Sequence, residues 1–295
     1  MAMSAPNART LEGVRVLSLA LNLPGPAAVW RLKAMGATCI KLEPPSGDPM
    51  AHYCASAYRQ MHKGIKVLTE DLKAPKGQER LNALLAATDI LVTSFRPSAL
   101  KKLGLSWQTL QRQHPHLSHV AIVGAPGTAA EIAGHDLTYM AATGLVTAEA
   151  LPPSLFADMA GALAATEAAL AVTLRRIQTG CGVRQVVTLA ESATFLSQPR
   201  TWGLTQPTGI VGGAHAGYRI YACKDGRVAV AALEPHFATG LLVATGLATA
   251  VSAKQVDWFA DDTRARLTRY FAEQTSEALR ALAHQNDLPI HCMTA

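Results

Sequence analysis

The sequence is poor in aromatic residues and lacks clustered cysteines. Aromatic side chains make up only 5% of the 295 residues, which suits helices packed on a sheet better than a β-sandwich rich in Tyr and Trp. The five cysteines are widely scattered, without a CxxC pair or the spacing of a zinc site. We therefore expect reduced thiols and no bound metal.

The chain also lacks a recognisable leader and a long apolar segment. It begins MAMSAPNART, with no apolar stretch behind a basic head. Further along, no segment approaches ~20 apolar residues without a polar interruption. These absences predict a cytoplasmic protein that is neither exported nor inserted in a membrane.

Dense runs of basic residues are missing as well, although the net charge is +6 and the isoelectric point is near 9.2. The basic clusters are as short as Lys101-Lys102 and Arg175-Arg176, whereas nucleic-acid binders usually concentrate their charge. The sequence therefore favours a small phosphorylated ligand over a nucleic acid. The alternative is a basic surface that contacts only solvent.

Short apolar runs alternate with helical patterns in the first part of the chain. Strands are predicted at residues 14–19, 38–42, 66–69, 89–93 and 119–123. The segments between them have apolar residues at helical spacing, and several open with proline or a serine cap. Such alternation builds βαβ units and a parallel sheet with helices on both faces. The expected fold class is α/β, a Rossmann-like doubly wound parallel sheet with a second, smaller domain.

The later part of the chain changes character twice. Residues 157–177 are nearly all small or apolar, so they predict one long buried helix, followed by a strand at 185–189. Residues 206–217 are rich in Gly, Pro and Thr, as is typical of a loop or an interdomain crossing. Strands at 218–223 and 227–232 flank an Asp-Gly turn, a strong hairpin signal.

From residue 237 onwards the pattern is mostly helical. These changes predict a large α/β domain over residues 1–190, a linker over 191–216 and a small domain over 217–295.

A dinucleotide-binding site is the first functional hypothesis for such a fold. The loop that contains Gly25, the helix after it and Glu43 at the end of the second strand imitate the Rossmann arrangement. However, Pro24-Gly25-Pro26 offers one glycine where the fingerprint needs three, and Pro26 has no amide to donate to pyrophosphate. Nicotinamide or flavin binding is therefore disfavoured.

Three segments gather acid–base side chains: Gly134-His135-Asp136, Asp158-Met159-Ala160-Gly161 and Leu233-Glu234-Pro235-His236. Each has an ordinary structural explanation. An Asp at the start of a helix often accepts hydrogen bonds from free backbone amides, and a His before an Asp is often only a hydrogen-bonded loop residue. Their combination with the rest of the chain makes a functional explanation stronger.

The order of many short motifs resembles the family III CoA-transferases, a group that also contains α-methylacyl-CoA racemase. The motifs are Gly13-Val14-Arg15-Val16-Leu17, Gly25-Pro26, Met35-Gly36-Ala37, Ile40-Lys41-Leu42-Glu43-Pro44-Pro45, Gly47-Asp48-Pro49, Asp71-Leu72-Lys73, Pro75, Gly77, Phe95-Arg96-Pro97, Leu103-Gly104-Leu105, Gly134-His135-Asp136, Asp158-Met159-Ala160-Gly161 and Asp225-Gly226. They cover most of the chain in the family's order.

The resemblance implies catalytic roles for three residues. In the racemase branch, the aspartate that matches Asp158 and the histidine that matches His135 exchange one proton with C2 of a 2-methylacyl-CoA from opposite faces. A glutamate that matches Glu234 accompanies the histidine there. In the transferase branch, the same aspartate attacks the thioester and carries the acyl group and then CoA. The motifs favour racemase-like chemistry, and CoA transfer to a carboxylic acid stays the alternative.

The resemblance also implies a CoA site and a partner chain. The nucleotide part of CoA would lie near Leu23, Pro24, Arg96 and Lys101 or Lys102. Ile65 stands where relatives have a basic residue, so Lys63 or Lys66 is expected to substitute for it, and Lys66 is assigned to the CoA site. The CoA thioester is the substrate, with no covalently bound cofactor.

Family members form interlocked homodimers, so a homodimer is expected here too. The sequence ends before the family's usual C-terminal return to the large domain. A degenerate CoA-binding member without turnover is therefore a further alternative.

Overall fold

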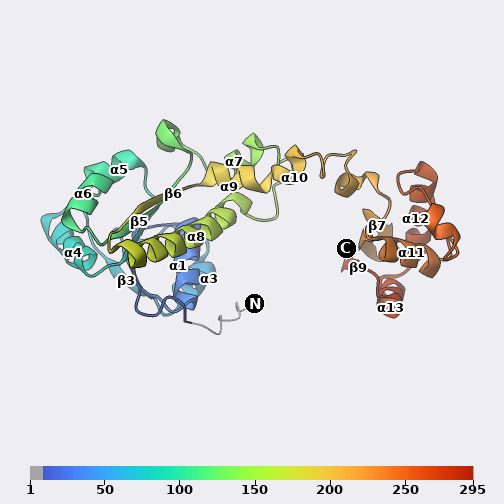
Figure 1. Cartoon of the computed structure of the whole chain (residues 1–295), viewed down its shortest axis with the longest axis horizontal. Coiled ribbons are helices and arrows are strands. Elements are labelled where there is room, and N and C mark those ends of the chain that lie inside the picture. The colour runs from blue at the N-terminus through green and yellow to red at the C-terminus, as the bar shows by residue number, and fades with distance from the viewer. Residues whose placement is uncertain (1–8, 295) are drawn as a thin grey trace. The chain divides into compact units, whose positions relative to one another are not determined.

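The computed structural model describes residues 9–294, and the chain divides into two compact units between Ser197 and Gln198 (Figure 1). The division falls inside the segment 191–216, for which the sequence predicts a linker. The first unit is a doubly wound α/β fold, and the second is a smaller α+β unit.

The first unit is built on six strands that are all parallel: β1 (Arg15–Ser18), β2 (Thr38–Glu43), β3 (Lys66–Thr69), β4 (Ile90–Thr93), β5 (Ser118–Val123) and β6 (Arg184–Thr188). Their order across the sheet is β3-β2-β1-β4-β5-β6. This is the Rossmann order, in which the direction of winding reverses between β1 and β4. The predicted fold class is confirmed, and the five early strands lie within a residue or two of their predicted bounds.

The helices of the first unit are α1 (Pro24–Ala34), α2 (Met50–Tyr53), α3 (Ala55–Met61), α4 (Pro75–Ala86), α5 (Pro97–Lys102), α6 (Trp107–Gln113), α7 (Asp136–Ala142), α8 (Phe156–Thr179) and α9 (Leu189–Leu196). Helices α4, α5 and α6 lie on one face of the sheet, and α1 and α8 on the other (Figure 1). Helix α1 begins at Pro24, earlier than its apolar pattern predicts. Proline fits there because the first turn of a helix needs no amide donors.

The two faces of the sheet have different cores. Leucines of α4, α5 and α6, such as Leu81 and Leu110, fill one face. On the other face α8 offers small residues, among them Ala162, Ala165 and Ala169, and so packs closely against α1, β5 and β6. By length and composition α8 is the one helix in residues 9–294 that could span a membrane. This packing accounts for the small residues of α8 that are buried.

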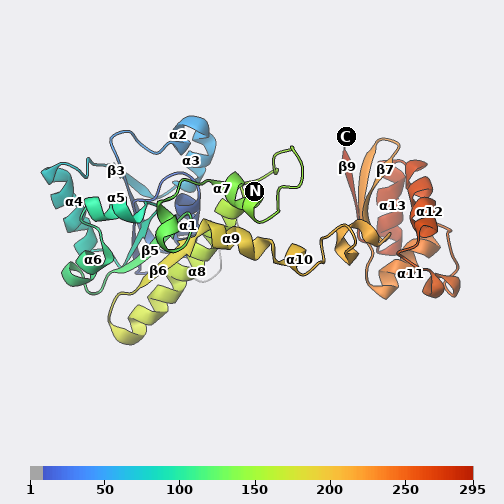
Figure 2. The same cartoon turned by 90° about the horizontal axis from the view of Figure 1, so that it is seen from above.

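The second unit contains α10 (Gln198–Thr201), β7 (Tyr218–Cys223), β8 (Gly226–Ala231), α11 (Pro235–Ala244), α12 (Asp261–Ala272), α13 (Ser276–Asn286) and β9 (Ile290–Thr294). The predicted hairpin is confirmed, since β7 and β8 pair antiparallel around the Asp-Gly turn. Strand β9 was not expected, because the sequence pattern after residue 237 predicts mostly helix. It pairs antiparallel with β8 and completes a three-stranded sheet that packs against helices (Figure 2).

A fully buried lysine lies at the centre of a charged cluster beside the first strands. Lys41, on β2, is 1% exposed, and its Nζ contacts the carboxylates of Asp48 and Glu43 and lies 2.9 Å from His62 Nε2. The acids and the histidine lie close enough together to bind a cation, and the ammonium group of Lys41 already fills that place. Burial of such a charge is tolerated only when it is paired and hydrogen-bonded.

We expect Asp48→Ala to destabilise the first unit by about 3 kcal/mol, because it leaves Lys41 buried with one carboxylate fewer. The exposed pair Arg9–Glu12 of the same unit provides the control, since Glu12→Ala should cost no more than about 1 kcal/mol. Equilibrium unfolding in denaturant measures both variants. Equal losses would show that the Lys41 cluster adds no more than a surface ion pair.

Candidate functional site

A cavity of about 490 Å³ opens at the carboxyl ends of β1, β4 and β5. Ligands of doubly wound folds bind there, where the winding of the sheet reverses. Residues after β1 form one wall, residues after β4 a second, and the segment from Gly124 to Tyr139 with the start of α8 a third. The site residues therefore come from loops that the parallel sheet brings together.

The wall after β1 is fixed by the buried Lys41 cluster. Asn22 has a φ of 66°, in the left-handed region that asparagine tolerates better than most residues. Its amide donates to Asp48 Oδ1 at 3.0 Å, and its side-chain oxygen accepts from the Tyr53 hydroxyl. The loop thereby presents Leu23 and Pro24 to the cavity.

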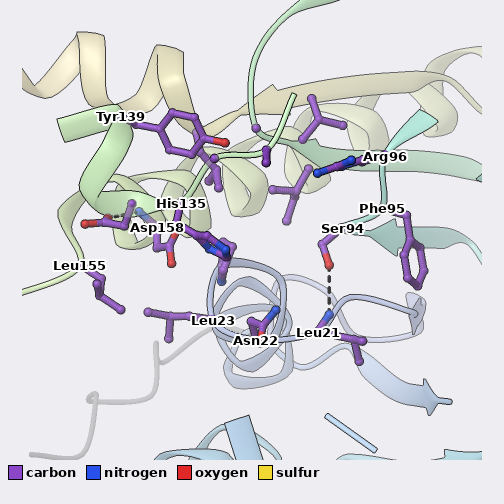
Figure 3. Close-up of a pocket in the computed structure, with 18 of the residues that line it drawn as sticks. Leu21, Asn22, Leu23, Ser94, Phe95, Arg96, His135, Tyr139, Leu155 and Asp158 are labelled. Carbon is purple, nitrogen blue, oxygen red and sulfur yellow. Dashed lines mark hydrogen bonds between the residues drawn. The ribbon is translucent and has the colours of Figure 1, made fainter. Parts of the chain in front are cut away.

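The wall after β4 brings a cation to the cavity. Ser94 Oγ accepts a hydrogen bond from the Leu21 amide at 3.0 Å, so the loops after β1 and β4 are tied together. Arg96 follows as the exposed residue that precedes α5, and it lines the cavity with Phe95 (Figure 3). A guanidinium in this position suits a phosphate or carboxylate ligand.

The third wall carries two carboxyls and an imidazole. His135 and Asp158 lie at the same end of the cavity, away from Ser94 and Phe95 (Figure 3). The backbone of His135 is held by Thr138, whose hydroxyl bonds both its amide and its carbonyl. Asp136 is buried, and its Oδ1 accepts from the Asp158 amide at 2.9 Å. This hydrogen bond joins the Gly-His-Asp segment to the start of α8.

Asp158 titrates abnormally for a carboxyl group. Burial, followed by the negative charge of Asp136, raises the pKa of Asp158 to about 6, although the nearby His135 acts in the opposite direction. A carboxyl that titrates near neutral pH can both accept and release a proton. Strong perturbation of this kind in a cavity is typical of functional groups.

The structure brings together part of the predicted site. Leu23, Pro24, Arg96, His135 and Asp158 all line the cavity. Three predicted lysines do not: exposed Lys101 borders a smaller cavity of about 170 Å³, Lys102 lies beside it on α5, and Lys66 begins β3. Glu234 belongs to the second unit, where it is exposed and precedes α11.

Among the cavity residues to which the sequence analysis gave no role of their own, three matter most for the geometry. Asn22 shapes the first wall, Asp136 positions Asp158, and Tyr139 lines the cavity from α7. Asp136 and Tyr139 lie three residues apart, a spacing that places both on one side of a helix. Because His135 directly precedes Asp136, this helical spacing could have indicated that Asp136 and Tyr139 lie on the side of the helix near His135.

Comparison with known proteins finds relatives that match most of the chain. The family model of CoA-transferase family III matches residues 11–294. Human α-methylacyl-CoA racemase is 28% identical over 90% of this chain and 72% of its own length. Human succinyl-CoA:glutarate CoA-transferase is 27% identical over 77% of this chain, and the match spans only 57% of that enzyme.

A solved structure shares the fold. The crystal structure of Rv3272 from Mycobacterium tuberculosis superposes with a TM-score of 0.83. The superposition covers 98% of this chain and 83% of the other at 23% sequence identity. The fold of both units is therefore known from experiment in another protein.

We expect Asp158→Asn to raise the unfolding temperature above that of the wild type at about pH 8, by the equivalent of at most about 3 kcal/mol. A raised pKa means that the folded state disfavours the ionised carboxylate. The difference should shrink as the pH falls through about 6 and vanish below about 4, where Asp158 is protonated whether folded or not. Calorimetry across this range provides the measurement.

Asp89→Asn is the matched control, with the opposite sign. Burial alone would raise the pKa of Asp89, but hydrogen bonds from Arg15 and the charges of Arg176 and Arg15 lower it overall. This variant should therefore be less stable than the wild type at about pH 8, and the deficit should fade in acid. A pH-independent effect of Asp158→Asn would contradict the assigned titration.

Proposed function

We propose that this chain, which belongs to CoA-transferase family III, is an enzyme that epimerises a 2-methylacyl-CoA at C2. In this reaction one of Asp158 and His135 removes the C2 proton, and the other returns a proton from the opposite face. The electron pair of the broken C–H bond is held meanwhile as an enolate of the thioester. No change in oxidation state is involved.

The observation that carries the proposal is the carboxyl of Asp158, with its pKa raised to about 6, beside His135 in one cavity. A base that removes a proton and an acid that returns one must both titrate near the working pH. Asp136 favours this by raising the pKa of Asp158 and by fixing its backbone.

The cavity suits an acyl-CoA. Its volume of about 490 Å³ lies within the range of small-molecule pockets. Apolar side chains, among them Leu23, Ile132 and Leu155, face it together with the Arg96 guanidinium. We assign Arg96 to an anionic group of CoA and the apolar side chains to the acyl or pantetheine chain.

CoA transfer is the second candidate, because Asp158 is also placed to attack a thioester. The carboxylate oxygen would form an acyl anhydride and release the CoA thiolate, which would then attack the aspartyl carbonyl, giving an aspartyl thioester and releasing the acyl group as its carboxylate. The acceptor carboxylate would resolve this thioester by the same two steps in reverse, so that CoA leaves on the acceptor. The similarity to the human glutarate CoA-transferase supports this candidate. Hydroxylamine treatment during turnover, followed by mass spectrometry of the peptide with Asp158, detects the covalent intermediate.

We expect His135→Ala to abolish C2 proton exchange from one enantiomer of 2-methyldecanoyl-CoA, while exchange from the other survives in part through Asp158. The asymmetry follows because each base faces one side of C2. Loss of an acid–base group typically lowers the rate by about 10²–10⁴. Deuterium incorporation from heavy water, measured separately for the two enantiomers, tests this.

Three outcomes distinguish the candidates. Less than about fivefold loss with both enantiomers would reject epimerisation, because it lies far below the loss expected for an acid–base group. A trapped Asp158 adduct would then establish CoA transfer. A wild-type protein that binds CoA but supports neither reaction would be a binding member of the family.

We further propose that the protein is a homodimer. Met159, Leu163, Leu174 and Ile177 are exposed on α8. At 3.6 residues per turn they form one stripe along the helix. Exposed apolar stripes of this length usually mark interfaces, and a second copy of the chain fits the family's dimeric habit.

We expect the double variant Leu174→Asp, Ile177→Asp to be monomeric, because two carboxylates would be desolvated in the interface. Light scattering after gel filtration should give the mass of two 31.2-kDa chains for the wild type and of one for the variant. Val251→Asp is the control, because Val251 is an exposed apolar residue of the second unit and does not belong to the α8 stripe. This variant should stay dimeric. A monomeric wild type would reject the dimer.

A further inference from the structure

One backbone amide at the start of α8 is already occupied by a hydrogen bond within the protein. Both proposed reactions place negative charge on the thioester carbonyl oxygen, which needs a donor aimed at it. A helix N-terminus beside Asp158 would be a natural source. However, the Asp158 amide already donates to Asp136 Oδ1 at 2.9 Å.

Tyr139 offers another donor in the same cavity. Its ring projects from α7, and its hydroxyl points into the cavity from the wall that carries Asp158 and His135 (Figure 3). Within residues 9–294 no protein group forms a hydrogen bond with this hydroxyl. The other tyrosine of the cavity, Tyr53, donates to Asn22 instead.

Two glycines leave room for the Tyr139 hydroxyl. A Cβ at Gly124, just after β5, would collide with the hydroxyl oxygen. A Cβ at Gly134 would collide with the same oxygen and would come within 2.7 Å of the ring carbon that bears it. The hydroxyl therefore lies in a notch between the end of the sheet and the residue before His135. A phenol confined in this way is pre-organised, as an effective donor must be.

The surroundings of Tyr139 keep its proton in place. Burial, followed by the charge of Asp158, raises the pKa of the phenol, while Arg96 acts weakly in the other direction. The hydroxyl is thus close enough to Asp158 to feel its charge, and it stays a donor at neutral pH.

From this geometry we propose that Tyr139 is a further catalytic residue, whose hydroxyl donates a hydrogen bond to the thioester oxygen as negative charge develops there. The phenol keeps its proton throughout. In epimerisation the C2 proton goes to Asp158 or His135, and in CoA transfer the charge lies on the tetrahedral adduct of Asp158. This inference rests on the proposed acyl-CoA chemistry and holds for either reaction.

Tyr139→Phe removes the hydroxyl and keeps the ring. We expect it to lower kcat by about 10²–10³, the usual cost of one donor to an oxyanion, with KM changed far less. Tyr270→Phe, which removes a partly buried hydroxyl in the second unit, is the matched control and should keep wild-type kcat. Rates are measured with 2-methyldecanoyl-CoA by deuterium incorporation and by CoA transfer.

A spectroscopic measurement isolates the hydrogen bond from turnover. The infrared stretch of a 13C-labelled thioester carbonyl of bound 2-methyldecanoyl-CoA should lie at lower frequency in the Asp158→Asn variant than in the double variant that also carries Tyr139→Phe. Equal frequencies, or a loss of kcat below about fivefold, would overturn the role of Tyr139 while the wild-type activity stands. A wild type without either activity would instead reject the proposed function, and this role with it.

Discussion

The ammonium group of Lys41 is the charge around which the first wall of the cavity is built. It holds Asp48 in the interior, and Asp48 in turn accepts the amides of Asn22 and Met50, which both line the cavity. Removal of such ions from water is costly, and the cluster offsets this cost by pairing the Lys41 ammonium group with Asp48, Glu43 and His62. Hydrogen bonds between charged, buried groups are directional. The hydrogen bond from the Asn22 amide to Asp48 Oδ1 thus helps to hold the left-handed conformation of Asn22.

The third wall, which carries Asp136 and Asp158, brings like charges together instead of opposite ones. Around Lys41 the charges are of opposite sign and satisfy one another, whereas Asp136 and Asp158 are two acids held close together. An acid in the first turn of a helix is normally stabilised by the helix dipole. Here burial and the charge of Asp136 outweigh that effect, and the pKa of Asp158 rises. One wall thus pairs opposite charges, and the other holds two like charges close together.

The sequence predicted the parallel sheet well, because β4 and β5 contain the apolar runs 90–92 and 120–123, each set between helices with clear start signals. It missed β9, a strand of five residues that include His and Thr. This strand forms by pairing with β8, which is far away in the sequence. The motifs singled out Asp158 and His135, which lie in one cavity. They did not predict the Lys41 cluster, although Lys41 and Glu43 two residues apart on a strand lie on one face. Partners such as Asp48 and His62 become evident only in three dimensions.

The hydrogen bond between Asp136 and the Asp158 amide links these observations to the chemistry. It satisfies a backbone donor at a helix start, which stabilises the fold, and it brings a second negative charge near the carboxyl of Asp158. The same bond removes that amide from the set of donors available to a substrate. A side-chain donor in the cavity would replace the one that this bond occupies. Tyr139, one turn after Asp136 on the same helix, is held against two glycines where it can do so.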